Sequence, residues 1–234
     1  MRRALRVVGG LFIVVVALWA GIRSYAQRSS QRLHTASIEA SAGAAGAPLA
    51  SDAAAPQDLG YVNGSRIPEK LPVFTLGDVA GKATSIAAWQ GKSLVLNFWA
   101  TWCAPCQREI PLLLALHREW AARNVEVIGI AVDNPGKVRS FAHQFNITYP
   151  LLVGDQDAMD VITSLGVQSP AFPFTVFTDR RGEVVALFMG ELHKPQANLI
   201  LDQVQQLNQD HTGLAAARRA IADGLSALSM HHSG

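Results

Sequence analysis

The sequence predicts an α/β fold for the part of the chain that begins at about residue 61. Apolar runs that suit buried strands alternate there with stretches of helical periodicity. The run KSLVLNFWA (92–100) is mostly apolar, which is typical of a central strand covered on both faces. Near the end, the short turn RRG separates two apolar runs, so the last strand pair is expected to be antiparallel.

The individual elements follow from the same patterns. The runs VFTL (73–76) and ATSI (83–86), joined through GDVAGK, predict a hairpin ahead of the strand at 92–100. A helix is expected from about 103 to 123, because a helical pattern follows that strand. The remaining expected elements are a strand at 125–132, a helix near 135–145, a strand around 149–153, a helix near 157–165, strands at 174–179 and 183–189, and a helix from about 195 to 207.

The chain opens with a segment that could cross a membrane. Residues 5–22 form an apolar run whose only charge is Arg6, and two further arginines precede it. The positive-inside rule then places everything after about residue 23 on the far side of the membrane. We expect residues 1–26 to be an uncleaved anchor or a signal peptide cleaved near SYA (24–26), and either would export the rest. The expected location is the periplasmic side of the inner membrane.

Composition separates this segment from a folded domain. The net charge of +2 arises from the six arginines of residues 1–32, since the rest of the chain holds 14 basic and 18 acidic side chains. The basic balance therefore reflects membrane topology, and no nucleic-acid partner is expected. Residues 27–60 are rich in Ala, Gly and Ser and predict a flexible linker, followed by a domain at 61–208.

A helical extension and tail are expected at residues 209–234. Leu214, Ile221 and Leu228 stand one heptad apart and give a narrow apolar stripe. Such a stripe could dock on the domain or on a partner, and we expect a loosely attached helix.

Both cysteines of the chain stand in NFWATWCAPCQREIP (97–111), two residues apart. This spacing allows metal ligation, a structural disulfide or reversible thiol–disulfide exchange. A disulfide at a helix start closes almost no loop and so stabilises little, and no further Cys or His pair at ligand spacing stands near it. At the start of a helix, Cys103 would have a lowered pKa and would attack as a thiolate, while Cys106, one turn further in and more buried, would resolve the mixed disulfide.

This stretch resembles the active site of thioredoxin-fold thiol–disulfide oxidoreductases of the TlpA/ResA type, which are exported and often membrane-anchored. LPVFTLGDVAGKATSIAAWQGKSLVLNFWATWC resembles the N-terminal hairpin and first strand of that family, and FPFTVFTDRRGEVV resembles the segment with its cis-proline and last strand pair. The resemblance covers about residues 67–208. It implies a thioredoxin fold with an added N-terminal β-hairpin and a central αβ insertion.

The same resemblance implies which residues surround the cysteines. Pro173 would be the cis-proline opposite them, with Pro170 as a rival because GVQSPAFP is about two residues longer than the usual pattern. Phe172 would then contact the substrate or the sulfur atoms, and Trp102 would cover the site.

Two polar residues of this stretch are linked to proton transfer. Asn97 stands where cytoplasmic thioredoxins carry a buried carboxylate, and Glu109 lies on the same helix face as Cys106. In ResA-like proteins an acid at the place of Glu109 is linked to the thiol chemistry, so Glu109 is the candidate for tuning the thiol pKa values. A solvated helix glutamate is the alternative.

The function implied by the resemblance is reduction of protein disulfides. It implies electrons from a transmembrane thiol donor of the DsbD or CcdA kind, and substrates such as apocytochrome c, hence cytochrome c biogenesis, or the copper-site cysteines of oxidase assembly factors. No cofactor and no resident metal are expected. A thiol peroxidase is an alternative, although the usual Pro-x-x-x-Thr-x-x-Cys pattern is absent. Another is a copper-binding chaperone that uses the two thiolates with Met230, His231 and His232.

Overall fold

The computed structural model describes residues 61–62 and 65–231, and it confirms the α/β class. The expected membrane segment and linker, at 1–26 and 27–60, lie outside these residues. In the described part of the chain, no helix combines the length and the apolar character that crossing a bilayer requires.

The strands and helices follow one another in the expected order. In chain order they are β1 (Tyr61–Val62), β2 (Ser65–Arg66), β3 (Thr75–Asp78), β4 (Ala83–Ser85), the 3-10 helix η1 (Ile86–Trp89), β5 (Ser93–Trp99), α2 (Ala104–Trp120), the 3-10 helix η2 (Ala121–Arg123), β6 (Val125–Val132), α3 (Pro135–Gln144), β7 (Leu151–Gly154), α4 (Gln156–Ser164), β8 (Phe174–Thr178), β9 (Val184–Met189), α5 (Lys194–Asn208) and α6 (Leu214–His231).

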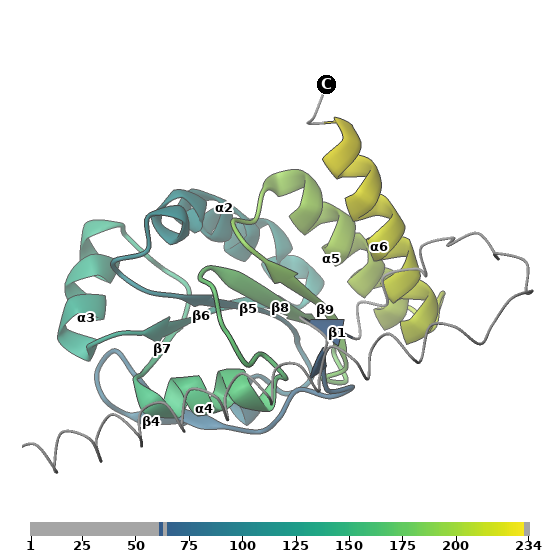
Figure 1. The fold of residues 1–234 in the computed structure, drawn as a ribbon. Helices are drawn as coiled ribbons and strands as arrows, with labels where there is room; N and C mark the ends of the chain where they lie inside the picture. Colours follow the sequence, from purple (N-terminus) through teal and green to yellow (C-terminus); the bar gives the residue numbers. More distant parts are fainter. Residues whose placement is uncertain (1–60, 63–64, 232–234) are drawn as a thin grey trace, which may run out of the picture. The chain divides into compact units, whose positions relative to one another are not determined.

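Seven of the strands form one mixed sheet, in the order β4-β3-β7-β6-β5-β8-β9. The central strand β5 is parallel to β6, with Ser93 opposite Val125 and Trp99 opposite Ala131, and antiparallel to β8. All residues of β5 are buried, because helices cover both faces of the sheet (Figure 1). The strand therefore behaves as its continuous apolar run predicts, and it leads directly into the turn that carries the cysteines.

The hairpin β3–β4 extends this sheet instead of standing apart from it. Its inner strand pairs with β4 on one side and with β7 on the other. The strand begins two residues later than expected, so Val73 lies outside it and is 79% exposed. The tight turn explains the shift: the Asp78 carboxylate accepts hydrogen bonds from the backbone N–H groups of Ala80 and Lys82, and Gly81 adopts a positive φ of 85°.

The two faces of β5 contribute to two different hydrophobic cores. Leu94, Leu96 and Phe98 belong to the core that contains residues of α4, while Val95 and Trp99 belong to the core that contains residues of α2, α3 and α5. Successive side chains of a strand point to opposite faces. Asn97 therefore shares the face of Val95 and Trp99, and it is directed towards α2.

The C-terminal helix α6 packs firmly on the domain, so the expectation of a loosely attached helix is wrong. Ala217 and Ile221 are completely buried, and the Arg218 guanidinium donates a 2.7 Å hydrogen bond to the carbonyl of Val184 at the start of β9. Gly224 allows a close approach to α5, since a Cβ there would lie 2.7 Å from Cδ2 of Leu199. These small residues make the contact surface wider than the heptad stripe indicates.

Candidate active site

The two cysteines lie at the start of α2 and form a disulfide. Cys103 is the N-cap residue of the helix, Cys106 lies in its first turn, and their Cα atoms are 5.3 Å apart. The backbone N–H of Cys106 donates to Sγ of Cys103 at 3.3 Å. After reduction, the same N–H and the positive end of the helix dipole would favour the thiolate of Cys103.

Both sulfur-bearing side chains are buried in the disulfide form. Cys103 is 5% exposed and Cys106 is 1% exposed. The direction of this difference agrees with the sequence prediction, but the contrast is small. The position of Cys103 at the helix terminus therefore distinguishes the two sulfurs more strongly than exposure does.

Aromatic residues form a rim beside the disulfide. Trp102 is 68% exposed, and its ring contacts the half-buried ring of Phe172 edge-on at a centroid distance of 6.1 Å. The Phe172 ring stacks on Phe174 at 6.2 Å, and Phe174 stacks on the buried Phe98 at 4.4 Å. The structure thus brings Trp102 and Phe172 together at the surface, supported from the core, and substrate binding by this pair stays a prediction.

The cis-proline is Pro173. The Phe172–Pro173 peptide bond is the one cis bond among the described residues, so the rival assignment to Pro170 is wrong. Pro173 is buried and directly precedes β8, which pairs with β5. It is thereby held next to the strand that leads to the cysteines.

Glu109 is buried in the domain, which contradicts the alternative of a solvated helix glutamate. Its side chain is 2% exposed. One carboxylate oxygen accepts a 2.5 Å hydrogen bond from the side-chain amide of Asn97 on β5, and the other accepts a 2.9 Å bond from the backbone N–H of Leu192, in the loop between β9 and α5. The Asn97 amide also donates to the hydroxyl of Thr175 at 3.1 Å. Two segments, β5 and the β9–α5 loop, therefore bind the carboxyl group of Glu109, and Thr175 of β8 in turn holds Asn97.

This environment makes Glu109 a weak acid that titrates near neutral pH. Burial raises the pKa of Glu109 to about 7, against the opposing effect of the hydrogen bonds from Leu192 and Asn97, and the negative charge of Glu191 raises it slightly further. Glu191 is itself paired with Arg108 of α2 through two short N–H···O contacts. Glu109 can therefore take up or release a proton in the pH range in which thiols react.

Sequence reasoning missed the partners of Glu109. Asn97 carried a signal, because a polar side chain inside a doubly covered strand must find a hydrogen-bond partner. The backbone N–H of Leu192 carried none, since every residue except proline has such a group.

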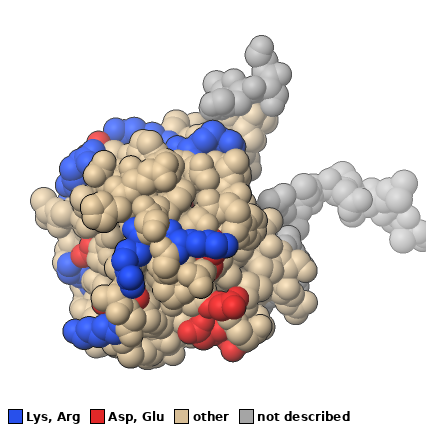
Figure 2. Space-filling model, turned by 90° about the vertical axis from the view of Figure 1, so that its left-hand side faces the viewer, with Lys and Arg blue, Asp and Glu red and all other residues tan. Residues whose placement is uncertain are grey.

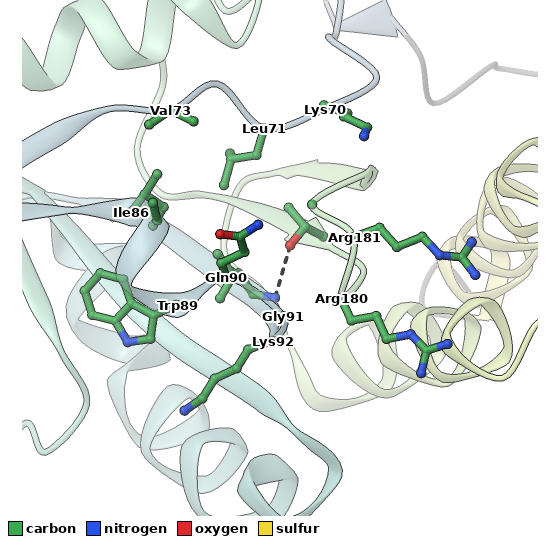
Figure 3. A pocket seen from close by; sticks show the side chains of 14 residues that line it. Lys70, Leu71, Val73, Ile86, Trp89, Gln90, Gly91, Lys92, Arg180 and Arg181 are labelled. Carbon is green, nitrogen blue, oxygen red and sulfur yellow. Dashed lines mark hydrogen bonds between the residues drawn. The ribbon is translucent and has the colours of Figure 1, made fainter.

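A pocket of about 260 Å³ lies at the far end of β5 and β8 from the cysteines. Figure 3 shows that the Arg180 and Arg181 side chains point away from its interior, and the guanidinium of Arg181 contacts Asp210 instead. Lys92, also at its rim, pairs with Glu126 at 2.7 Å. The lining includes none of the residues around the disulfide, so this pocket is separate from the candidate active site.

The surface on the side of α3 is mixed in charge. Figure 2 shows Lys and Arg side chains in separate groups among uncharged residues, with Asp and Glu side chains scattered between them and one larger acidic group at the lower right. This face of the described residues therefore presents no continuous patch of one charge to a partner.

The structure gives no support to copper binding within its described part. Among residues 61–62 and 65–231, no three His, Cys, Asp or Glu side chains lie close enough to hold a metal ion. Met230 is 70% exposed at the end of α6. The side chains of His231 and His232 lie outside the described part, so that alternative stays a hypothesis.

Comparison with known proteins gives consistent matches. The sequence model of the AhpC/TSA family matches residues 67–187. The thiol-disulfide oxidoreductase ResA of Geobacillus thermodenitrificans (strain NG80-2) is 32% identical over 135 residues, which cover 57% of this chain and 75% of that protein. A solved thiol:disulfide interchange protein of the thioredoxin family from Chlorobium tepidum TLS is 28% identical with a TM-score of 0.52, covering 60% of this chain and 96% of the other. A DsbF homologue from Corynebacterium diphtheriae is 26% identical with a TM-score of 0.51, covering 61% and 89%.

The matched segment contains both cysteines, the buried Glu109 and the cis-proline. The structural match to the thioredoxin-family protein covers 60% of this chain, and α2 begins directly after its N-cap Cys103. The chain therefore belongs to the AhpC/TSA family and is a thiol–disulfide oxidoreductase of the ResA type.

Proposed function

We propose that this chain reduces disulfides of exported proteins, with Cys103 as the attacking thiolate. One observation carries the proposal. The disulfide stands at the start of α2, where the sulfur of Cys103 accepts a hydrogen bond from the backbone N–H of Cys106. A disulfide across two residues contributes little to stability, whereas a helix terminus activates a thiol. The place of the bond therefore suits reactivity better than structural support.

The reaction has two exchange steps. The Cys103 thiolate attacks one sulfur of the substrate disulfide, which forms a mixed disulfide and releases the other substrate sulfur as a thiolate. The Cys106 thiolate then attacks the sulfur of Cys103, which restores the Cys103–Cys106 bond and releases the second substrate thiolate. Two electrons pass to the substrate, and an external dithiol must later return two electrons to the protein.

Glu109 suits the proton transfer that the second step needs. It lies three residues after Cys106 on α2, both side chains are buried, and its carboxyl group titrates near neutral pH. As a carboxylate it can take the proton of the Cys106 thiol, so that the attacking thiolate forms only inside the mixed disulfide.

The charge of Glu109 also bears on the direction of the reaction. A carboxylate near the two sulfurs disfavours a second negative charge, which destabilises the reduced form with its Cys103 thiolate relative to the disulfide. We therefore expect a reducing couple, nearer to about −270 mV, as in thioredoxin, than to about −120 mV, as in a strong oxidant. Equilibration with glutathione buffers, followed by alkylation and mass measurement, gives the potential. A reduction potential of about −120 mV would contradict the proposal that the protein works as a reductant.

The proposed setting is the periplasmic side of the inner membrane. The apolar run at 5–22 and the arginines before it support export, and a transmembrane thiol donor of the DsbD or CcdA kind would then supply electrons. Cytochrome c maturation or assembly of a copper site in an oxidase would supply disulfide-bearing substrates.

A reporter fusion tests the export. An alkaline phosphatase domain fused after Ser65 folds to an active enzyme only outside the cytoplasm, so we expect phosphatase activity. The control lacks residues 1–26 and should be inactive. An inactive full-length fusion that is expressed at a normal level would contradict export.

A further inference from the structure

We propose that Asp133 is a positioning residue that holds the turn before Cys103, through Thr101, in the geometry that activates the thiol. The inference rests on the proposed role of Cys103 as the attacking sulfur. Asp133 directly follows β6 and is distant from both cysteines in the sequence.

The parallel pairing of β5 and β6 brings the two residues together. Trp99 lies opposite Ala131 in the register, and Thr101 and Asp133 each follow two residues later in the chain, just beyond the ends of β5 and β6. One carboxylate oxygen of Asp133 accepts a hydrogen bond from the backbone N–H of Thr101 at 3.2 Å and another, very short one from its hydroxyl. A single side chain thus receives both donors of the residue that starts the cysteine turn.

The environment of Asp133 suits a fixed anchor. Its side chain is only 6% exposed, and its other oxygen accepts the backbone N–H of Asn134 at 2.7 Å. Burial alone would raise the pKa of Asp133, but the hydrogen bonds from Thr101 and Asn134, with the nearby ammonium group of Lys137, lower it below its usual value. The carboxylate is therefore charged wherever the thiols react, and charge-assisted hydrogen bonds are the stronger kind.

A second contact holds the same turn from the other side. The side-chain amide of Gln107, on α2, donates to the carbonyl of Thr101 at 2.9 Å, and the N–H of Cys103 donates to the carbonyl of Ala100 at 3.2 Å. Both backbone groups of Thr101 are thereby bound, one by Asp133 directly after β6 and one by Gln107 on α2. These contacts hold Cys103 at the helix terminus, where its sulfur accepts a hydrogen bond from the backbone N–H of Cys106.

Positioning and charge have opposite effects on the Cys103 thiol. Loss of the anchor should weaken the contact with the helix terminus and raise the pKa of Cys103. Loss of the negative charge of Asp133 by itself should lower that pKa, because a nearby carboxylate opposes a thiolate. The sign of the shift therefore separates the two roles.

The test uses four variants of the full chain, each reduced and alkylated over a range of pH. Thr101→Val removes the hydroxyl donor without changing any charge, and we expect alkylation of Cys103 at pH 6 to slow by about three- to tenfold. Thr101→Ser keeps the hydroxyl and should react at nearly the wild-type rate. Asp133→Ala should also slow the reaction, because we expect the loss of the anchor to outweigh the loss of the nearby negative charge. The control Asp202→Asn removes an exposed carboxylate on α5 and should leave the rate unchanged.

The double variant completes the cycle. Because both residues act through one contact, Thr101→Val should add little to the effect of Asp133→Ala. Faster alkylation in Asp133→Ala, additive effects, or wild-type rates in Thr101→Val would each overturn the proposal. Thermal unfolding shows whether Asp133→Ala folds, and if it does not, the comparison of Thr101→Val with Thr101→Ser decides. If Cys106 is alkylated before Cys103 in the wild-type protein, the proposed role of Cys103 as the attacking sulfur is wrong. This measurement on the wild type alone distinguishes that failure from failure of the role of Asp133.

Discussion

Cys106→Ser is expected to accumulate a covalent complex with its substrate, whereas Cys103→Ser is expected to form none. Cys103 is the N-cap residue of α2 and Cys106 lies inside the first turn, so the first sulfur attacks and the second resolves. Without Cys106 the mixed disulfide persists. Both variants should lose turnover by several orders of magnitude, since each lacks one of the two exchange steps. Non-reducing gels and mass spectrometry of the trapped species measure the difference.

The same variants can contradict the assignment. If Cys103→Ser traps as much substrate as Cys106→Ser, the assignment of Cys103 as the nucleophile is wrong. The same follows if Cys106 is alkylated before Cys103 in the reduced wild-type protein. A protein that unfolds whenever the disulfide is reduced would show that the bond is structural. Wild-type protein reduced with dithiothreitol and checked by thermal unfolding is the control for the last case.

Local patterns were sufficient to predict most of the fold. The strand β6 coincides with the expected range at 125–132, because its run of Val and Ile is bounded by polar residues on both sides. The hairpin was displaced because Asp78 both ends a strand and caps the turn. The apolar stripe indicated the burial of Ile221, but the firm attachment of α6 was not predicted, because Ala217 and Gly224 contribute to packing through their small size and not through apolar area.

The candidate site was predictable to a similar depth. Cys103 and Cys106 stand in a motif, so the sequence was enough to find them, whereas Pro173 had Pro170 as a rival until the structure placed the cis bond. Glu109 was an open choice between a functional and a solvated residue, and only the packing of α2 against β5 and the β9–α5 loop decides for burial. The contact of Thr101 with Asp133 depends on the register of two parallel strands, which no local pattern specifies.

The buried carboxyl group of Glu109 should make the stability of the domain depend on pH. Its pKa in the folded protein is about 7, above its ordinary value of 4.5, because burial disfavours the charged form. A group whose pKa is raised by folding contributes stability that is fully present below its unfolded pKa. That contribution is lost as the pH rises through the folded pKa, so the relevant window is from about pH 4.5 to pH 7.

Glu109→Gln should therefore abolish a pH-dependent part of the free energy of unfolding. Between pH 4 and pH 8 the wild-type protein should lose about 3 kcal/mol relative to the variant, because glutamine does not titrate and all other groups are shared. Denaturant titrations of the oxidised proteins at both pH values measure this change. The matched control is Glu119→Gln, on the same helix, whose side chain is 48% exposed and pairs with Lys194 on the surface. The free energy of unfolding of Glu119→Gln should change between the two pH values by the same amount as that of the wild type. If the free energy of unfolding of Glu109→Gln also changes by the same amount as that of the wild type, the carboxyl group of Glu109 titrates as an ordinary glutamate. The proposed role of Glu109 in proton transfer near neutral pH would then be wrong.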